Sequence, residues 1–159
     1  MLLDFEHHKN PRVRQAFEIA KEAHKYQKDK AGAEYINHPV AVASDVGDDV
    51  SAIILALLHD VIEDHFDKYN LNILKREVHL SVYEVAALKL LTHDESESYF
   101  DYIAKIKSNE LAKTVKLADL KHNSDRNRLL NITHKDEERL KKYETAIKML
   151  NDTENANAD

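Results

Sequence analysis

The stretch IILALLHDVIED, residues 53–64, is the part of the sequence that decides the fold. Six apolar residues are followed by four polar ones that could bind a metal or transfer protons, and only Val61 and Ile62 interrupt these four. On a helix, residues four apart lie above one another, so the spacing predicts that His59 stacks with Glu63 and Asp60 with Asp64. Burying unpaired charge is costly. The stretch is therefore either a core helix that ends in a solvated polar turn or a helix that carries part of a site.

Composition favours an all-α fold. The 159 residues suit one domain with a sizeable core, and they contain only two glycines and two prolines. A sheet protein needs more turn-forming residues, whereas the abundant Ala, Leu, Lys and Glu favour helices. We expect a compact single-domain bundle of about seven or eight helices.

Several classes of protein are disfavoured. The absence of cysteine excludes disulfides, thiolate metal sites and a cysteine nucleophile, while ten histidines supply imidazole ligands. A net charge of -6 argues against binding to nucleic acid, although a bound divalent ion could still attract a small anion. No apolar run approaches the roughly 20 residues of a membrane span, and no basic region precedes an apolar one at the start. We expect a cytoplasmic protein without a membrane partner.

Capping residues and apolar spacing predict the helices. The expected ranges are 11–27, 40–46, a helix from 48 or 49 through the opening stretch, 70–78, 82–91, 98–107, 110–123 and 133–150. Residues 1–150 would form the domain, and the polar residues 151–159 a disordered tail.

Three polar signals interrupt the apolar pattern. His38 precedes Pro39 at a helix start, His59-Asp60 ends the apolar run, and Asp119 lies among mostly apolar neighbours. Asp119 alone could be solvated or paired with a lysine. Together the four form a set of two histidines and two carboxylates, which suits Mn²⁺, Fe²⁺, Zn²⁺ or Mg²⁺.

The order His38, His59-Asp60, Asp119 resembles the H…HD…D signature of HD-domain metal-dependent phosphohydrolases. More of the chain follows this likeness: Ala23-His24 with Gln27, residues 35–39, residues 56–64, and residues 115–119 with His122-Asn123. These motifs are similar to the hydrolase domain of the Rel/SpoT family and its small stand-alone alarmone hydrolases. The resemblance covers roughly residues 13–130.

The resemblance implies an all-α HD-type fold and a Mn²⁺ ion held by the four residues of the signature. It implies removal of the 3′-pyrophosphate from (p)ppGpp or a related phosphorylated nucleotide. Glu63 and Asp64 match the family's catalytic acidic pair, and which of them is the acid stays open. Their pKa would have to be raised for acid catalysis near neutrality.

The same resemblance bears on substrate contacts. Asn123 matches a residue that contacts the nucleotide, and we add Tyr35, Lys30 and Arg126 as candidate substrate-binding residues. Arg128, two residues further on, could also reach a phosphate. Asp29 stands where the family carries an arginine that stacks on guanine. Aspartate can neither stack on a base nor pair with phosphate, so base specificity stays open.

The remaining histidines and tyrosines receive structural expectations. We expect His24 to make a structural hydrogen bond and His122 to shape the site without binding metal. The other expectations are surface positions for His65, His79, His93 and His134, and core-edge positions for Tyr69, Tyr83, Tyr99 and Tyr102.

Two other functions are compatible with the sequence. One is an HD phosphatase of nucleoside monophosphates or other small phosphoesters, suggested by Asp29. The other is a non-catalytic metal or nucleotide sensor, which would not need both Glu63 and Asp64. The expected partner is a small phosphorylated nucleotide substrate, and the oligomeric state is not predicted.

Overall fold

A computed structural model describes residues 1–152. These residues form nine α-helices and one 3₁₀ helix, and contain no β-strand. The elements are α1 (Pro11–His24), α2 (Asn37–Ser44), α3 (Val50–Leu58), α4 (Val61–Asp64), α5 (Leu71–Val78), α6 (Val82–Leu91), α7 (Tyr99–Lys107), α8 (Glu110–Asn123), η1 (Arg126–Arg128) and α9 (His134–Asn151). The predicted all-α fold is confirmed. The predicted disordered tail falls mainly on residues 153–159, which lie outside the described residues, and Asn151 is the last residue of α9.

Helix α3 is the inner helix of the bundle. Every residue from Ala52 to Leu58 is buried, so this helix has no solvated face. It packs against α1, α2, α6 and α8. Asp49 caps its first turn by accepting the backbone N–H of Ala52 at 3.2 Å.

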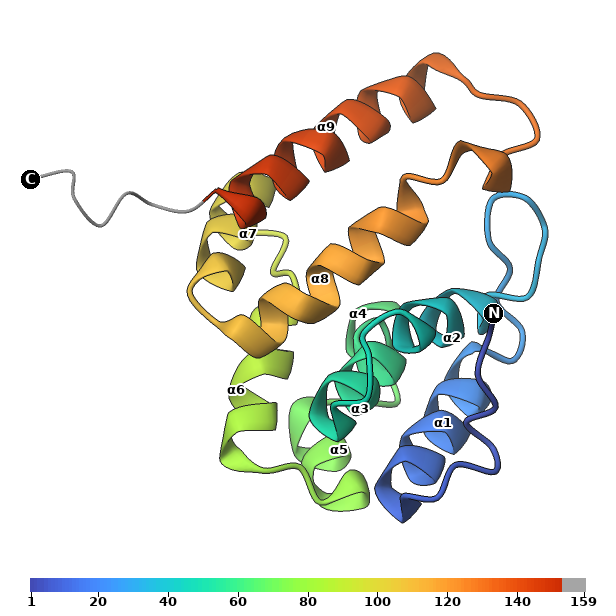
Figure 1. The fold of residues 1–159 in the computed structure, drawn as a ribbon, viewed down its shortest axis with the longest axis vertical. Coiled ribbons are helices and arrows are strands. Elements are labelled where there is room, and N and C mark those ends of the chain that lie inside the picture. The colour runs from blue at the N-terminus through green and yellow to red at the C-terminus, as the bar shows by residue number, and fades with distance from the viewer. Residues whose placement is uncertain (153–159) are drawn as a thin grey trace, which may run out of the picture.

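Helix α8 connects the two halves of the bundle. It lies between α2 and α3 on one side and α7 and α9 on the other (Figure 1), and it packs against all four. Because α2, α3 and α8 also contact one another pairwise, residues from three distant parts of the sequence can meet at one point. None of the helices in residues 1–152 is both long and apolar enough to cross a bilayer.

Capping signals located most helix starts correctly. Ser81 and Thr133 each form a capping box, and Asn70 and Asn109 accept backbone N–H groups of the turns that follow them. Two predicted boundaries were wrong. Helix α1 ends at His24 instead of residue 27, because the chain turns there into a loop closed by a bridge between residues 28 and 34.

The second wrong boundary is the start of α2, at Asn37 instead of residue 40. Proline lacks a backbone N–H, and the first turn of a helix does not need one, so Pro39 is accommodated inside α2. His38 therefore lies in the first turn of this helix and is buried.

The opening stretch is not one continuous helix. Helix α3 ends at Leu58, and the four-residue helix α4 begins at Val61. His59 and Asp60 form the turn between them, and the Asp60 backbone departs from helical geometry with φ -101° and ψ -4°. The break does not abolish the spacing predicted for Asp60 and Asp64, because the Asp64 backbone N–H donates to the Asp60 carbonyl at 3.0 Å, one helical turn away. The stacking of His59 with Glu63 stays a prediction.

Candidate functional site

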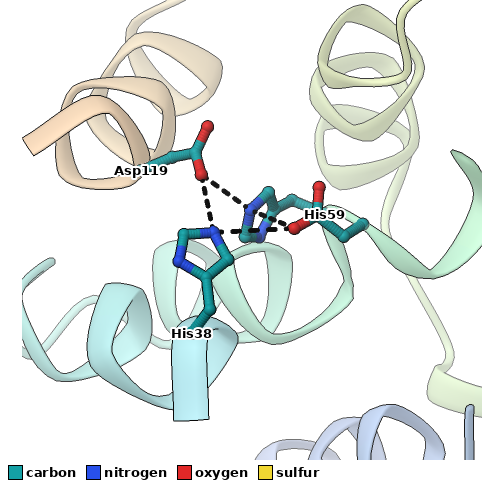
Figure 2. A group of neighbouring side chains, drawn as sticks. His38, His59 and Asp119 are labelled. Atoms are coloured by element: carbon teal, nitrogen blue, oxygen red, sulfur yellow. Dashed lines mark hydrogen bonds and ion pairs between the residues drawn. The ribbon is translucent and has the colours of Figure 1, made fainter. Parts of the chain in front are cut away.

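The four predicted ligands converge on one point of the protein. His38 comes from α2, His59 and Asp60 from the turn after α3, and Asp119 from α8. One ligand atom of each lies within 4.8 Å of those of the others. We call these four residues the ligand cluster. Figure 2 shows His38, His59 and Asp119 pointing toward a common centre from three different helical segments.

The distances within the ligand cluster are short. The Nε2 atom of His38 lies 2.8 Å from Asp119 Oδ1 and 3.6 Å from Asp60 Oδ2. The Nε2 atom of His59 lies 3.1 Å from Asp60 Oδ2 and 3.2 Å from Asp119 Oδ1. His38, His59 and Asp119 are buried, and Asp60 is partly open to solvent. Two imidazole nitrogens and two carboxylate oxygens thus face a space of the size that one ion occupies.

Hydrogen bonds behind the two histidines orient their rings. His59 donates Nδ1–H to the backbone carbonyl of Ala56 at 2.6 Å. His38 Nδ1 lies 2.7 Å from His122 Nδ1. Burial, together with the charge of Arg128, lowers the pKa of His122 to about 4, so this ring is neutral and can accept a hydrogen from His38. These bonds direct the Nε2 atoms of His38 and His59 toward the ligand cluster.

The sequence left open whether Asp119 pairs with a lysine or belongs to a ligand set, and in the structure it does both. Its Oδ2 atom pairs with Lys116 at 2.8 Å, while Oδ1 faces both histidines and accepts from Asn123 Nδ2 at 3.1 Å. Burial alone would raise its pKa. Lys116 and His59 outweigh burial and hold the pKa of Asp119 well below its usual value. The carboxylate is therefore charged and available to a cation.

Asp60 and His59 form the second charged pair of the ligand cluster. Burial would lower the pKa of His59, but Asp60 and Asp119 outweigh it and raise that pKa well above its usual value. The pKa of Asp60 is lowered, mainly by His59 against the opposing effect of burial. The Tyr35 hydroxyl donates to Asp60 Oδ2 at 2.7 Å, and burial raises the pKa of Tyr35 so that it remains a donor. A divalent ion would replace the proton on His59 as the countercharge.

Glu63 and Asp64 lie next to the ligand cluster but are not part of it. Glu63 accepts the backbone N–H of His93, and Asp64 Oδ2 accepts from Gln27 Nε2 at 3.0 Å. Desolvation by neighbouring atoms, with the nearby charge of Asp60, raises the pKa of both carboxyls. Two such groups can hold or release protons closer to neutrality than ordinary carboxyls.

A group of polar residues behind Asp64 was not predicted. Gln27 Oε1 lies 2.8 Å from His24 Nδ1 and 2.7 Å from His65 Nε2, while the amide of the same side chain donates to Asp64. His24 is fully buried, as its expected structural hydrogen bond requires. The surface position predicted for His65 is wrong, because this ring is half-buried against His24.

For the other histidines and tyrosines, some of the predicted positions are correct and some are wrong. His93 was expected on the surface, but it is half-buried and stacked on Tyr102 with ring centroids 4.6 Å apart. Tyr83 was expected at the core edge and is 82% exposed. His79 and His134 are exposed as predicted. Tyr69 and Tyr99 lie at the core edge as predicted, whereas Tyr102 is fully part of the core.

A cavity of about 300 Å³ adjoins the ligand cluster. His38 and Tyr35 form its wall on that side, and α9 forms the opposite wall. Its lining residues include four cations, Lys28, Lys30, Arg128 and Arg139, and three carboxylates, Asp29, Asp125 and Asp136. In a protein of net charge -6, this concentration of cations beside a metal-type site suits a phosphorylated ligand.

Three of the four predicted substrate contacts line this cavity: Lys30, Tyr35 and Asn123. Arg126 does not line it. Its side chain is 55% exposed, and its guanidinium pairs with Glu137 at 2.8 and 3.0 Å. Arg128 lines the cavity in its place, since the 3₁₀ turn of η1 separates the directions of the two arginines. That turn could not be read from the spacing of the residues.

Asp29 also lines the cavity, and its side chain stabilises the loop that carries it. Its Oδ1 atom accepts the backbone N–H groups of Ala31 and Ala33, each at 2.9 Å. These bonds fix the turn of the loop between α1 and α2. Aspartate at this position is thus part of the loop's own structure.

Comparison with known proteins finds similarity to one group of enzymes, although no family model matches the chain. Guanosine-3′,5′-bis(diphosphate) 3′-pyrophosphohydrolase of Haemophilus influenzae is 38% identical over 117 residues, which are 66% of this chain and 17% of that protein. A probable GTP pyrophosphokinase of Mycobacterium leprae is 33% identical over 121 residues, 70% of this chain and 15% of that protein. SpoT of Escherichia coli, a bifunctional (p)ppGpp synthase/hydrolase, is 48% identical over 56 residues, covering 33% of this chain and 8% of SpoT. The chain thus spans less than a fifth of the length of these relatives.

A solved structure supports the same relationship at the level of the fold. It is a metazoan orthologue of SpoT, described as hydrolysing ppGpp, and it matches with a TM-score of 0.72. The match covers 92% of this chain and 89% of the other at 20% identity. The predicted HD-type fold is confirmed.

Proposed function

We propose that this chain, a homologue of the SpoT/Rel-type (p)ppGpp hydrolase domain, is a metal-dependent pyrophosphohydrolase. Its proposed substrate is (p)ppGpp or a related phosphorylated nucleotide, from which it removes the 3′-pyrophosphate. The observation that carries the proposal is the convergence of His38, His59, Asp60 and Asp119 beside a cavity with four lining cations. The relatives supply the substrate, and the geometry supports the type of chemistry.

The ligand cluster fits a divalent metal ion, and we propose Mn²⁺. Imidazole and carboxylate ligands with open positions are typical of ions that activate water. When bound there, such an ion lowers the pKa of a water molecule and neutralises phosphate oxygens. Ala56, His122 and Lys116 support the proposal, because they hold the ligands from behind as the partners of metal ligands do.

The proposed reaction is a hydrolysis in which one water is consumed. The water oxygen bonds to the phosphorus attached to the 3′ oxygen, the bond between that phosphorus and the 3′ oxygen breaks, and pyrophosphate leaves. From ppGpp the other product is GDP, whose 3′ oxygen takes up a proton. We propose that Glu63 and Asp64 handle these protons, one accepting from water and the other donating to the 3′ oxygen. Their raised pKa values and their position beside Asp60 support that role.

Substrate contacts are proposed for the cavity wall nearest the ligand cluster. Tyr35 and Asn123 already bond to Asp60 and Asp119, so they would place a ligand against the metal ligands. Lys30 lies 3.8 Å from Asp136 and can turn toward a phosphate. Arg126 was predicted for the same role, and its ion pair with Glu137 outside the cavity supports a surface role instead.

A second function is favoured by one observation. Asp29 lies in the cavity where the Rel/SpoT family carries a base-stacking arginine, so recognition of guanine lacks one element. An HD phosphatase of nucleoside monophosphates or other small phosphoesters would not need that element. It remains the alternative.

One assay distinguishes the two. The purified protein, loaded with Mn²⁺, is incubated separately with ppGpp, with mononucleotides and with a generic phosphoester, and the products are identified. Pyrophosphate and GDP from ppGpp support the proposal, while orthophosphate from monophosphates supports the alternative. Metal binding without turnover of any compound would indicate a sensor. Asp60→Ala serves as the control, and full activity in that variant would refute the metal mechanism.

A further inference from the structure

We propose that Arg128 determines substrate specificity by binding the 5′-phosphate group of a nucleotide whose 3′ group lies at the ligand cluster. Asp29 acts as the countercharge of Arg128 when no phosphate is bound. This inference rests on the proposed function, because it assigns the end of the nucleotide that is not cleaved.

Arg128 presents a free edge of its guanidinium. Its Nη1 atom donates to the backbone carbonyl of His122 at 3.0 Å and to Asn123 Oδ1 at 3.3 Å. Among the described residues, its Nε and Nη2 atoms make no hydrogen bond, and Nη2 lies 3.6 Å from Asp29 Oδ2. The Nε and Nη2 edge of an arginine is a fork that matches two oxygens of a phosphate. The side chain is thus fixed through one nitrogen and open through the other two.

The other cations of the cavity are either paired with a carboxylate or exposed to solvent. Lys28 forms an ion pair with Glu34, and Arg139 donates to Asp136 at 3.1 Å. Lys30 lies 3.8 Å from the same Asp136 oxygen, and its side chain is 57% exposed. Its ammonium group is therefore flexible and solvated. Arg128 combines partial burial, with 24% exposure, with an unused bidentate edge. It is the lining cation best prepared for an anion.

The position of Arg128 favours the phosphate that is not cleaved. Asn123 lies between Arg128 and the ligand cluster: its side-chain oxygen accepts from Arg128, and its NH₂ group donates to Asp119. The guanidinium is therefore close to the ligand cluster but separated from it by one side chain. A nucleotide with phosphates on both the 3′ and 5′ oxygens carries two anionic groups, so its 3′ group would lie at the metal centre and its 5′ group at the guanidinium.

Asp29 makes the site selective for a strong anion. Its Oδ1 atom is occupied by the loop, while Oδ2 faces Arg128 and offsets part of the positive charge. A ligand must compete with this carboxylate, which a doubly charged phosphate does and an uncharged sugar hydroxyl does not. The carboxylate of Asp29 is thus matched by the guanidinium of Arg128, 3.6 Å away.

The test measures binding without turnover. Calorimetry gives the affinities of the Mn²⁺-loaded protein for GDP, which carries only the 5′-diphosphate, and for guanosine, which carries no phosphate. The wild type should prefer GDP. Arg128→Ala should weaken GDP binding roughly ten- to hundred-fold, the usual range for a charged hydrogen-bonded contact, and should leave guanosine binding nearly unchanged. Arg76→Ala, which removes an exposed arginine from α5, is the matched charge control and should change neither affinity.

Several results would overturn the inference. One is a wild type without preference for GDP, and another is an Arg128→Ala variant that binds GDP as tightly as the wild type. Equal loss of affinity for GDP and guanosine in this variant, as a purely structural role requires, is a third. A larger loss of GDP affinity in Arg126→Ala than in Arg128→Ala would assign the site to the other arginine and would also overturn it. Circular dichroism of each variant checks that it is folded.

Asp29→Asn provides an independent measurement. Asparagine keeps an oxygen for the backbone N–H groups of the loop and removes the countercharge, so affinity for GDP should rise several-fold while affinity for guanosine stays constant. Unchanged or weaker GDP binding in a folded Asp29→Asn protein would contradict the proposed countercharge. Failure of the proposed hydrolysis has a separate signature, since the wild type would then bind GDP through Arg128 yet release no pyrophosphate from ppGpp.

Discussion

At the scale of single residues, the site depends on buried charges that neutralise one another. Asp119 is opposed by Lys116 on one oxygen and by two histidines on the other. Removing one partner leaves the remaining charge buried, which is more costly than removing the pair. The ligand cluster therefore contributes to stability as well as to chemistry, and the two contributions can be measured separately.

Asp119→Asn should lower the free energy of unfolding by about 3 kcal/mol, because Lys116 keeps a charge in a side chain that is only 12% exposed. The double variant Asp119→Asn, Lys116→Met should recover part of that loss and still fail to bind Mn²⁺. Urea unfolding and metal titration provide the two readouts. Equal stability of the single variant and the wild type would show that the Lys116 pair is not energetically important.

The pKa of His59 predicts opposite pH trends with and without metal. A histidine whose folded pKa is raised contributes stability that is complete below about pH 6.5, the value for the unfolded chain, and is lost as the pH rises through the folded pKa. Metal competes with the proton on this ring, so metal binding strengthens over the same rise. Thermal unfolding from about pH 6 to 8.5 should show that Mn²⁺ adds more stability at the higher pH. If the stability added by Mn²⁺ did not change with pH, the assignment of His59 as a ligand would be contradicted.

Glu63 and Asp64 are predicted to act on protons and not on metal. Glu63→Gln and Asp64→Asn should each lower kcat by roughly 10²- to 10⁴-fold, the usual contribution of general acid–base catalysis. Affinity for Mn²⁺ should hardly change, because neither side chain belongs to the ligand cluster. Loss of metal affinity in either variant would show instead that the residue is needed to form the metal site.

The sequence predicted individual residues well where local chemistry sufficed. The ligand set could be predicted, since His38, His59-Asp60 and Asp119 each interrupt an apolar pattern in a recognisable order. The contact of Gln27 with His24 and His65 could not, because it joins residues 38 positions apart through a loop whose path is set by tertiary packing. The spacing could not decide between Arg126 and Arg128 either, because the 3₁₀ turn of η1 sets which of them lines the cavity.

At the scale of elements, α3 is the support on which the ligand cluster is held. Its caps and apolar run made it predictable, and seven successive buried residues bear this out. The break after Leu58 was not predictable, because Val61 and Ile62 continue the apolar pattern as an unbroken helix would. At the turn, His59 contacts Asp119 of α8 and Asp60 accepts a hydrogen bond from Tyr35, which precedes α2.

Leu57→Ala tests this support. The side chain is fully buried in the core, so its truncation should lower the free energy of unfolding by about 2–5 kcal/mol through lost burial and the cavity left behind. Val82→Ala, at a position 78% exposed on α6, is the matched control and should change stability by less than about 0.5 kcal/mol. Denaturant unfolding gives both values. A loss below about 1 kcal/mol for Leu57→Ala would mean that α3 does not pack as described.

At the scale of the whole molecule, three helices distant in sequence form the ligand cluster and a fourth closes the cavity. The motif order was enough to expect that α2, the turn after α3, and α8 would meet. The contribution of α9 was not foreseen, because its wall of Asp136, Arg139 and Tyr143 carries no motif and follows only from the packing of α9 on α7 and α8. The ligand residues can thus be recognised from short stretches of sequence, whereas the shape of the cavity depends on how the helices pack.

The central claim is that a water molecule attacks the 3′ phosphorus of ppGpp at the ligand cluster. The most direct measurement is turnover of ppGpp by the Mn²⁺-loaded protein in water enriched in ¹⁸O, followed by mass spectrometry of the products. We predict equal amounts of GDP and pyrophosphate, with the label in pyrophosphate and none in GDP, and no turnover by Asp60→Ala. Label in the 3′-hydroxyl of GDP, release of orthophosphate in place of pyrophosphate, or the absence of turnover in the wild type would contradict the account.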